Sequence, residues 1–207
     1  TSLGETTEAE TKFCGKAGTV SIVNFDVWHR GSTNITDKKR YMLKFQFTRM
    51  EEPTKPTWHI KDLKWKPVED DNHNALSENV WNWLCGKKTA VHNNGSADQK
   101  KVSKLVQDLS DPNETIRINS AYTLGSMGES VVAVLIEALK SESLLLYQDM
   151  TKSNATNPQG GNPSDLYSSH ALTALGELAV PKLIQTLNAP DWWVRAAAAD
   201  IIGNIVP

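Results

Sequence analysis

The spacing of apolar residues changes near residue 98 and predicts two different kinds of structure on either side. Residues 98–207 carry apolar residues at helical spacing, arranged in units that each consist of two short helices joined by a turn containing Asp or Pro. The first unit reads Leu105, Val106, Leu109, Asp111-Pro112, Ile116-Arg117, Ala121, Leu124, Gly125. The third reads Leu183, Ile184, Leu187, Pro190-Asp191, Val194-Arg195, Ala198, Ile202, Gly203. This region is therefore predicted to be all-α.

The three units share an internal spacing. The last leucine of the first helix and the closing glycine are sixteen residues apart in the first unit, Leu109 to Gly125, and in the third, Leu187 to Gly203. In the middle unit, from Leu139 to Gly176, the gap is 37 residues. The surplus fits the Asn-, Gly- and Pro-containing stretch 147–168, which predicts a loop inserted between the two helices.

These units resemble HEAT repeats of the PBS-lyase-like type. The resemblance implies an α-solenoid over residues 98–207 that binds a protein partner. The last apolar helix lacks a polar cap, so we expect further repeats after residue 207.

Before residue 50 the apolar residues follow a period of two. Residues 18–25 and 41–47 are rich in β-branched and aromatic side chains and predict two β-strands. If the strands pair antiparallel, residues facing each other across the pair lie roughly 5 Å apart. His29 and Arg40, eleven positions apart, would then share one opening of the sheet.

The segment from His29 to Arg40, HRGSTNITDKKR, resembles the phytanoyl-CoA dioxygenase family of Fe(II)/2-oxoglutarate oxygenases over about residues 15–50. The resemblance implies that residues 1–50 are the last strands of a double-stranded β-helix, or jelly roll. It makes His29 a ligand of Fe(II) in a two-His-one-carboxylate triad and Arg40 the partner of a 2-oxoglutarate carboxylate. The implied reaction hydroxylates an unactivated C–H bond of a small-molecule substrate that the sequence does not identify. Asn34 and Thr36 are expected to shape the turn.

The family's other two iron ligands come from a His-x-Asp motif, which is absent from this sequence. We therefore expect that motif to lie before Thr1 in a longer parent protein, and this chain to be inactive alone. The alternative is a non-enzymatic HEAT-repeat scaffold whose degenerate β-domain never bound iron. A separate alternative for Arg40 is that it pairs with Asp26 or Asp37 and binds no cosubstrate. A metal-free, cupin-like sugar binder is a third alternative, without a supporting motif.

Residues 51–97 form the predicted connector. Trp58 and Trp65 are expected to hold its Pro-punctuated part against the β-domain. A short helix is predicted at 76–84, with Leu76, Val80, Trp83 and Leu84 on one face, before a linker at 86–97. The fold class is thus α+β and multidomain: a partial β-helix, the connector and the solenoid.

The composition of the chain limits the kinds of partner and the location that we expect. The 207 residues carry a net charge of −2 and 39% hydrophobic residues, so a buried core is expected and nucleic acid is not an expected partner. The two cysteines, Cys14 and Cys85, lie far apart and predict free thiols. No apolar run approaches the roughly 18 residues that cross a membrane, and the expected location is cytoplasmic.

Overall fold

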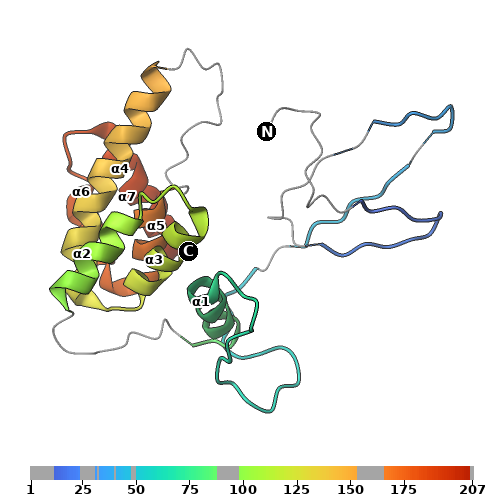
Figure 1. Cartoon of the computed structure of the whole chain (residues 1–207), viewed down its shortest axis with the longest axis horizontal. Coiled ribbons are helices and arrows are strands. Elements are labelled where there is room, and N and C mark those ends of the chain that lie inside the picture. Colours follow the sequence, from blue (N-terminus) through green and yellow to red (C-terminus); the bar gives the residue numbers. More distant parts are fainter. Residues whose placement is uncertain are drawn as a thin grey trace. The chain divides into compact units, whose positions relative to one another are not determined.

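The structure is a computed structural model. The chain forms two compact units, Thr1–Thr48 and Arg49–Pro207. The structure describes residues 12–23, 31, 33–39, 41–47, 50–87, 98–152 and 166–205, and only the backbone in 146–152. The helices, labelled in Figure 1, are α1 (Asn74–Leu84), α2 (Gln99–Asp108), α3 (Glu114–Gly125), α4 (Val132–Lys152), α5 (Tyr167–Leu175), α6 (Val180–Thr186) and α7 (Trp192–Ile205), with 3₁₀ turns η1 (Glu129–Val131) and η3 (Gly176–Leu178).

Helices α2 to α7 form three antiparallel pairs, α2–α3, α4–α5 and α6–α7. The second helices of the pairs pack side by side, α3 on α5 and α5 on α7, and so do the first helices, α2 on α4 and α4 on α6. The result is a two-layered stack, the arrangement expected of an α-solenoid. The prediction of an all-α region after residue 98 is confirmed for the residues that the structure describes there, 98–152 and 166–205.

The core lies between the two layers and consists mostly of leucine. The largest apolar side chains buried there completely are Leu124, Leu135, Leu139, Leu172, Leu175, Leu183, Val131, Val194 and Ile201. Each such side chain contributes roughly 1.5–3 kcal/mol when it leaves water. Small residues keep the layers close. A Cβ added to Gly125 would lie 2.5 Å from the Cβ of Ala174, so α3 and α5 touch at this point.

In the described part of unit 1–48, no residue is in a β-strand, and the predicted strand pair and jelly-roll remnant are not seen there. The apolar side chains of the predicted strands are exposed, Ile22 at 96% and Phe47 at 93%. The alternating pattern is present in the sequence, but two strands need a further apolar layer to pack against. The described residues of this unit supply none.

The connector packs differently from the prediction. Trp58 and Trp65 contact Trp81 of α1, at centroid distances of 5.8 and 5.9 Å, so they hold the segment on this helix and not on a β-domain. The indole N–H of Trp81 donates to the carbonyl of Leu63 at 3.1 Å. Trp81 of α1 is thus the aromatic side chain against which both tryptophans pack.

Helix α1 confirms the predicted helix, beginning two residues earlier than expected. The predicted apolar face is wrong in part, because Val80 and Trp83 are 41% and 40% exposed while Asn82 and Cys85 are buried. A polar contact with α3 helps to set the orientation of α1: the Asn119 Oδ1 accepts a hydrogen bond from the Ala75 amide at 3.3 Å.

The loop prediction at 147–168 is wrong at both ends, since α4 continues to Lys152 and α5 begins at Tyr167; residues 153–165 lie outside the described residues. The sequence from 141 to 152 holds neither Gly nor Pro, so the helix meets no local stop signal. Both cysteines are free as predicted, Cys14 exposed and Cys85 buried.

Candidate interaction surfaces

Two arginines organise the turns of the first and third helix pairs. The Arg117 Nη1 donates to the carbonyls of Asp111 and Pro112 at 2.5 and 3.0 Å. The Arg195 Nη1 donates to the carbonyls of Ala189 and Pro190, both at 2.8 Å. In each case the arginine binds the backbone five and six residues before it. The arginine of the Val/Ile-Arg dipeptide therefore stabilises the turn between the two helices of a pair.

The same turns carry equivalent N-caps. Asn113 accepts the Thr115 amide at 2.9 Å, and Asp191 accepts the Trp193 amide at 2.8 Å. Short polar side chains at this position satisfy amides that have no partner within the helix. The two helix pairs thus agree in cap, turn and arginine, which shows a structural repeat and not merely a similar apolar pattern.

The middle pair uses a different contact. Ser168, at the start of α5, stands where the other pairs have arginine, when the units are aligned on the closing glycines. Its amide donates to the Glu142 Oε2 at 3.0 Å, and its hydroxyl donates to the same oxygen. Glu142 of α4 therefore caps α5 from outside the helix. Burial raises the pKa of the Glu142 carboxyl, and the Ser168 hydrogen bonds oppose that rise.

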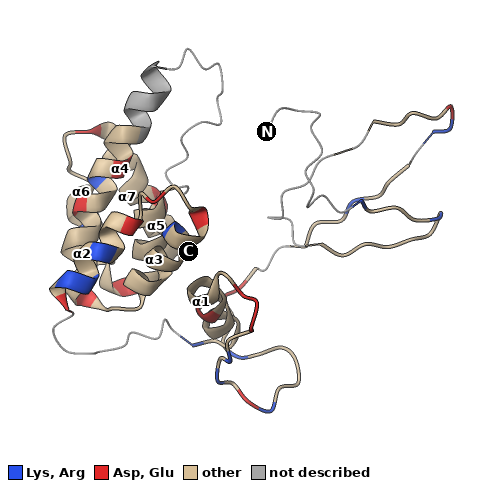
Figure 2. Cartoon of the chain, in the orientation of Figure 1, with Lys and Arg blue, Asp and Glu red and all other residues tan. Residues whose placement is uncertain are grey.

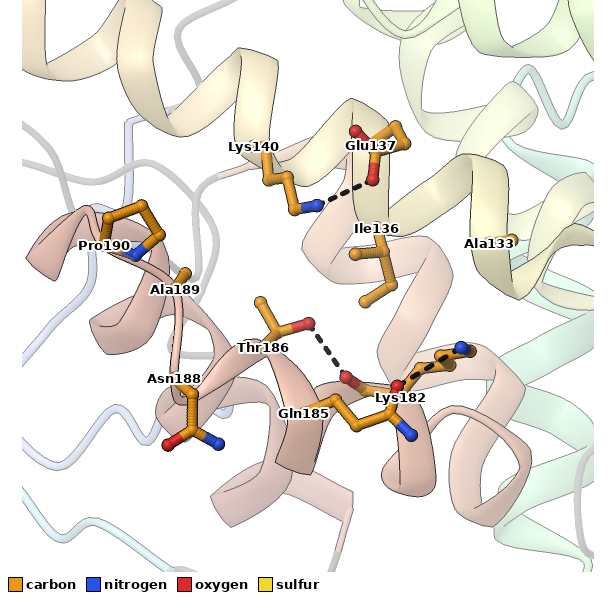
Figure 3. Close-up of a pocket in the computed structure, with 10 residues that line it drawn as sticks. All are labelled: Ala133, Ile136, Glu137, Lys140, Lys182, Gln185, Thr186, Asn188, Ala189 and Pro190. Atoms are coloured by element: carbon orange, nitrogen blue, oxygen red, sulfur yellow. Dashed lines mark hydrogen bonds and ion pairs between the residues drawn. The ribbon is translucent and has the colours of Figure 1, made fainter.

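A shallow groove of about 310 Å³ lies between α4 and α6 (Figure 3). The buried Ile136 contributes apolar surface, and polar side chains stand around it. Lys140 pairs with Glu137 at 2.7 Å, and the Lys182 Nζ donates to the Gln185 side chain at 3.2 Å. The groove therefore combines a small apolar patch with amide and ammonium groups.

An aromatic cluster spans α3 and α5. His170 stacks with Tyr122 at 6.2 Å and meets Tyr167 edge-on at 5.9 Å, while the Arg117 guanidinium lies 4.7 Å from the centroid of the Tyr167 ring. The arginine that closes the first turn thereby also contacts the second helix pair. Sequence reasoning missed this cluster and the Glu142 cap, because both connect residues in different units. The cation–aromatic contact ties the two helix pairs together.

The site predicted from the sequence, His29 and Arg40, lies outside the described residues. The turn between them is described: the Asn34 side-chain amide donates to the Lys38 carbonyl at 2.7 Å, and the Thr36 amide donates to the Asn34 Oδ1 at 3.1 Å. Asn34 and Thr36 shape the turn as expected. Among the described residues, no group of three His, Cys, Asp or Glu side chains could hold a metal ion.

Comparison with known proteins agrees with the repeat geometry. The family model for the HEAT repeat matches residues 179–207, which contain α6 and α7. No curated protein and no solved structure matches the chain. Within the described residues, no helix is both long and apolar enough to span a membrane.

Proposed function

We propose that the chain is a HEAT-repeat interaction scaffold that binds a segment of a partner protein in the groove between α4 and α6. The observation that carries this proposal is the groove of about 310 Å³ that α4 and α6, the first helices of two stacked pairs, form between them. HEAT repeats commonly mediate protein interactions, and the match at 179–207 includes one wall of the groove.

The chemistry of the groove indicates what it would bind. Its two lysines, Lys140 and Lys182, outnumber its one carboxylate, Glu137, so the groove favours a partner segment with an acidic side chain. The exposed amides of Gln185 and Asn188 suit the backbone groups of an extended segment. Because the groove is small, we expect a complex of moderate affinity from which the partner dissociates readily.

Site-specific photo-crosslinking in the source cells tests this proposal. A photoreactive residue at Ala133, exposed at the groove, should form an adduct with a defined protein, whereas the same residue at Ser103 on α2 should not. A peptide from the crosslinked protein is then titrated against the purified chain. Lys182→Glu should weaken binding by about tenfold, and Lys101→Glu, a matched change on α2, should not. Equal adducts at both positions, or equal affinities of both variants, would refute the groove as the site.

A second candidate rests on the segment from His29 to Arg40 and on the described Asn34 turn, which supports a reversal of the chain between them. In this proposal His29 is one ligand of Fe(II) and Arg40 binds 2-oxoglutarate, so that the protein hydroxylates a small-molecule substrate. One histidine does not make the ligand triad, so two further iron ligands are part of this proposal.

The test of this second candidate is succinate formation from 2-oxoglutarate by the longest natural polypeptide that contains these residues. His29→Ala should abolish it and Arg40→Lys should raise the 2-oxoglutarate requirement, because lysine cannot form the two parallel hydrogen bonds of arginine. Unchanged turnover in both variants would refute the assignment. The cytoplasmic location is also a proposal, tested by cell fractionation.

A further inference from the structure

Residues 55–66, which we call the connector loop, are held on α1 at three points. Trp58 and Trp65 each contact the ring of Trp81, at centroid distances of 5.8 and 5.9 Å. Between these two contacts, the carbonyl of Leu63 accepts a hydrogen bond from the Trp81 Nε1 at 3.1 Å. The loop therefore presents its side chains on a backbone that α1 holds in place.

The connector loop is basic in a chain that is not. It holds one carboxylate, that of Asp62, and four exposed lysines (blue in Figure 2), which are Lys55, Lys61, Lys64 and Lys66. Four positive charges and one negative charge give +3 for the loop, against −2 for the whole chain. The Lys87 Nζ adds a further ammonium, 2.7 Å from the Leu63 carbonyl. A local positive field of this kind attracts anions.

Apolar side chains are exposed among these lysines. Leu63, between Lys61 and Lys64, is 42% exposed, and Val68, just after the loop, is 60% exposed. Trp58 is 38% exposed. Protein segments at a membrane interface have this composition, because apolar side chains enter the boundary between headgroups and hydrocarbon while lysines meet anionic lipids.

We propose that the connector loop binds an anionic membrane surface, with Leu63, Val68 and Trp58 entering the interface and the lysines contacting lipid headgroups. Lysines beside tryptophans also bind single-stranded nucleic acid, whose bases stack on aromatic rings. Leucine and valine offer no ring on which a base can stack, whereas the interface of a bilayer accepts aliphatic side chains. The exposed aliphatic residues therefore favour lipid over nucleic acid.

The charges of the loop set the character of this binding. A lysine close to an anionic surface strengthens binding about fivefold, so the lysines should contribute more than the few partly exposed apolar side chains. We expect reversible binding that requires anionic lipid and weakens as the salt concentration rises. This inference goes beyond the groove between α4 and α6 and does not depend on it.

Co-sedimentation of the whole chain with lipid vesicles tests the proposal. We expect binding to vesicles of phosphatidylcholine and phosphatidylserine at a molar ratio of about 7 to 3, and binding about tenfold weaker to phosphatidylcholine alone. Lys61→Glu combined with Lys64→Glu should weaken binding to the mixed vesicles by more than about tenfold. Lys100→Glu combined with Lys101→Glu, the same change of net charge on exposed positions of α2, should leave binding nearly unchanged. Circular dichroism of each variant checks that the helices still form.

The apolar contact is tested separately. Leu63→Ser should weaken binding about threefold or more, whereas Leu145→Ser, at an exposed leucine of α4, should not. A fluorophore that responds to polarity is attached to Asp62→Cys, in a chain that also carries Cys14→Ser to remove the exposed thiol. Its emission should shift to shorter wavelength on the mixed vesicles, and the same label on Ser103→Cys should not respond.

Three results would overturn the proposal. The first is no binding to the mixed vesicles at low salt. The second is equal weakening by the loop variant and the α2 variant, which would reduce the effect to net charge. The third is binding to a single-stranded oligonucleotide, lost in Lys61→Glu with Lys64→Glu, by a chain that does not bind the vesicles. That result would assign the connector loop to nucleic acid instead.

Discussion

Arg117 and Arg195 make the same pair of hydrogen bonds in two helix pairs, each guanidinium holding two backbone carbonyls of the turn before its own helix. We expect Arg195→Ala to lower the free energy of unfolding by about 1–3 kcal/mol, because two turn carbonyls lose their donor. Arg195→Lys should recover only part of this loss, because the shorter lysine side chain cannot place its ammonium where the Arg195 Nη1 lies. Urea denaturation followed by circular dichroism measures both. Equal stability of the alanine variant and the parent chain would show that the arginine is not needed for the turn.

The two closing glycines should respond in opposite directions. Gly125→Ala forces α3 away from Ala174 and should destabilise the chain by about 1–3 kcal/mol. Gly203→Ala meets open space and should stabilise it by about 0.5–1 kcal/mol, because alanine favours the helix. Both are measured by urea unfolding followed by circular dichroism. A destabilising Gly203→Ala would contradict the open environment assigned to it.

Glu142 should make stability depend on pH. Burial raises the pKa of its carboxyl in the folded state above the ordinary value of 4.5. The folded chain then binds this proton more tightly than the unfolded chain, so the free energy of unfolding gains from Glu142 as pH falls through the folded pKa towards 4.5. Urea unfolding between pH 4 and 8 should show that gain in the parent chain and not in Glu142→Gln. The glutamine variant retains an acceptor for Ser168.

Two further variants separate the cap from the charge. Glu142→Ala leaves the Ser168 amide without an acceptor and should cost about 1–3 kcal/mol at any pH. Ser168→Ala removes only the hydroxyl donor and should retain the pH dependence. If the difference between the parent chain and Glu142→Gln is the same at every pH, the raised pKa is refuted.

Asn119 should control the docking of α1. Its side chain binds Ala75 and Asn72, so Asn119→Ala should speed amide hydrogen exchange in α1 while α4 to α7 keep the rates of the parent chain. The expected loss of local stability is about 1–2 kcal/mol. Asn204→Ala, an exposed amide on α7, is the matched control. Uniformly faster exchange along the whole chain would instead indicate that α1 and the stack unfold together.

Sequence reasoning located the helix pairs because their information is local. The apolar period, the turn at Asp111-Pro112 and the spacing from Leu187 to Gly203 all lie within one unit. It did not identify the Glu142–Ser168 cap, whose partners are separated by the inserted segment. The role of Arg117 as a donor to two carbonyls was also not visible, since an arginine after an apolar residue has many uses.

The errors have a common physical origin. Residues 18–23 and 41–47 have the alternation of strands, yet a strand forms only where other strands and an apolar layer accept it. Trp58 and Trp65 were correctly expected to pin the connector, but local sequence does not say which surface receives them. Which surface a side chain packs against depends on the tertiary structure, which local sequence does not determine. The roles of His29 and Arg40 stay predictions.

Amide hydrogen exchange of the whole chain, resolved by peptide, tests the central claim most directly. The claim is that stability resides in a stack of helix pairs and not in a β-domain. The account predicts strong, cooperative protection in α3, α5 and α7, and rapid exchange in 18–23 and 41–47. Strong protection in 18–23 and 41–47, together with rapid exchange in α3 and α5, would contradict it.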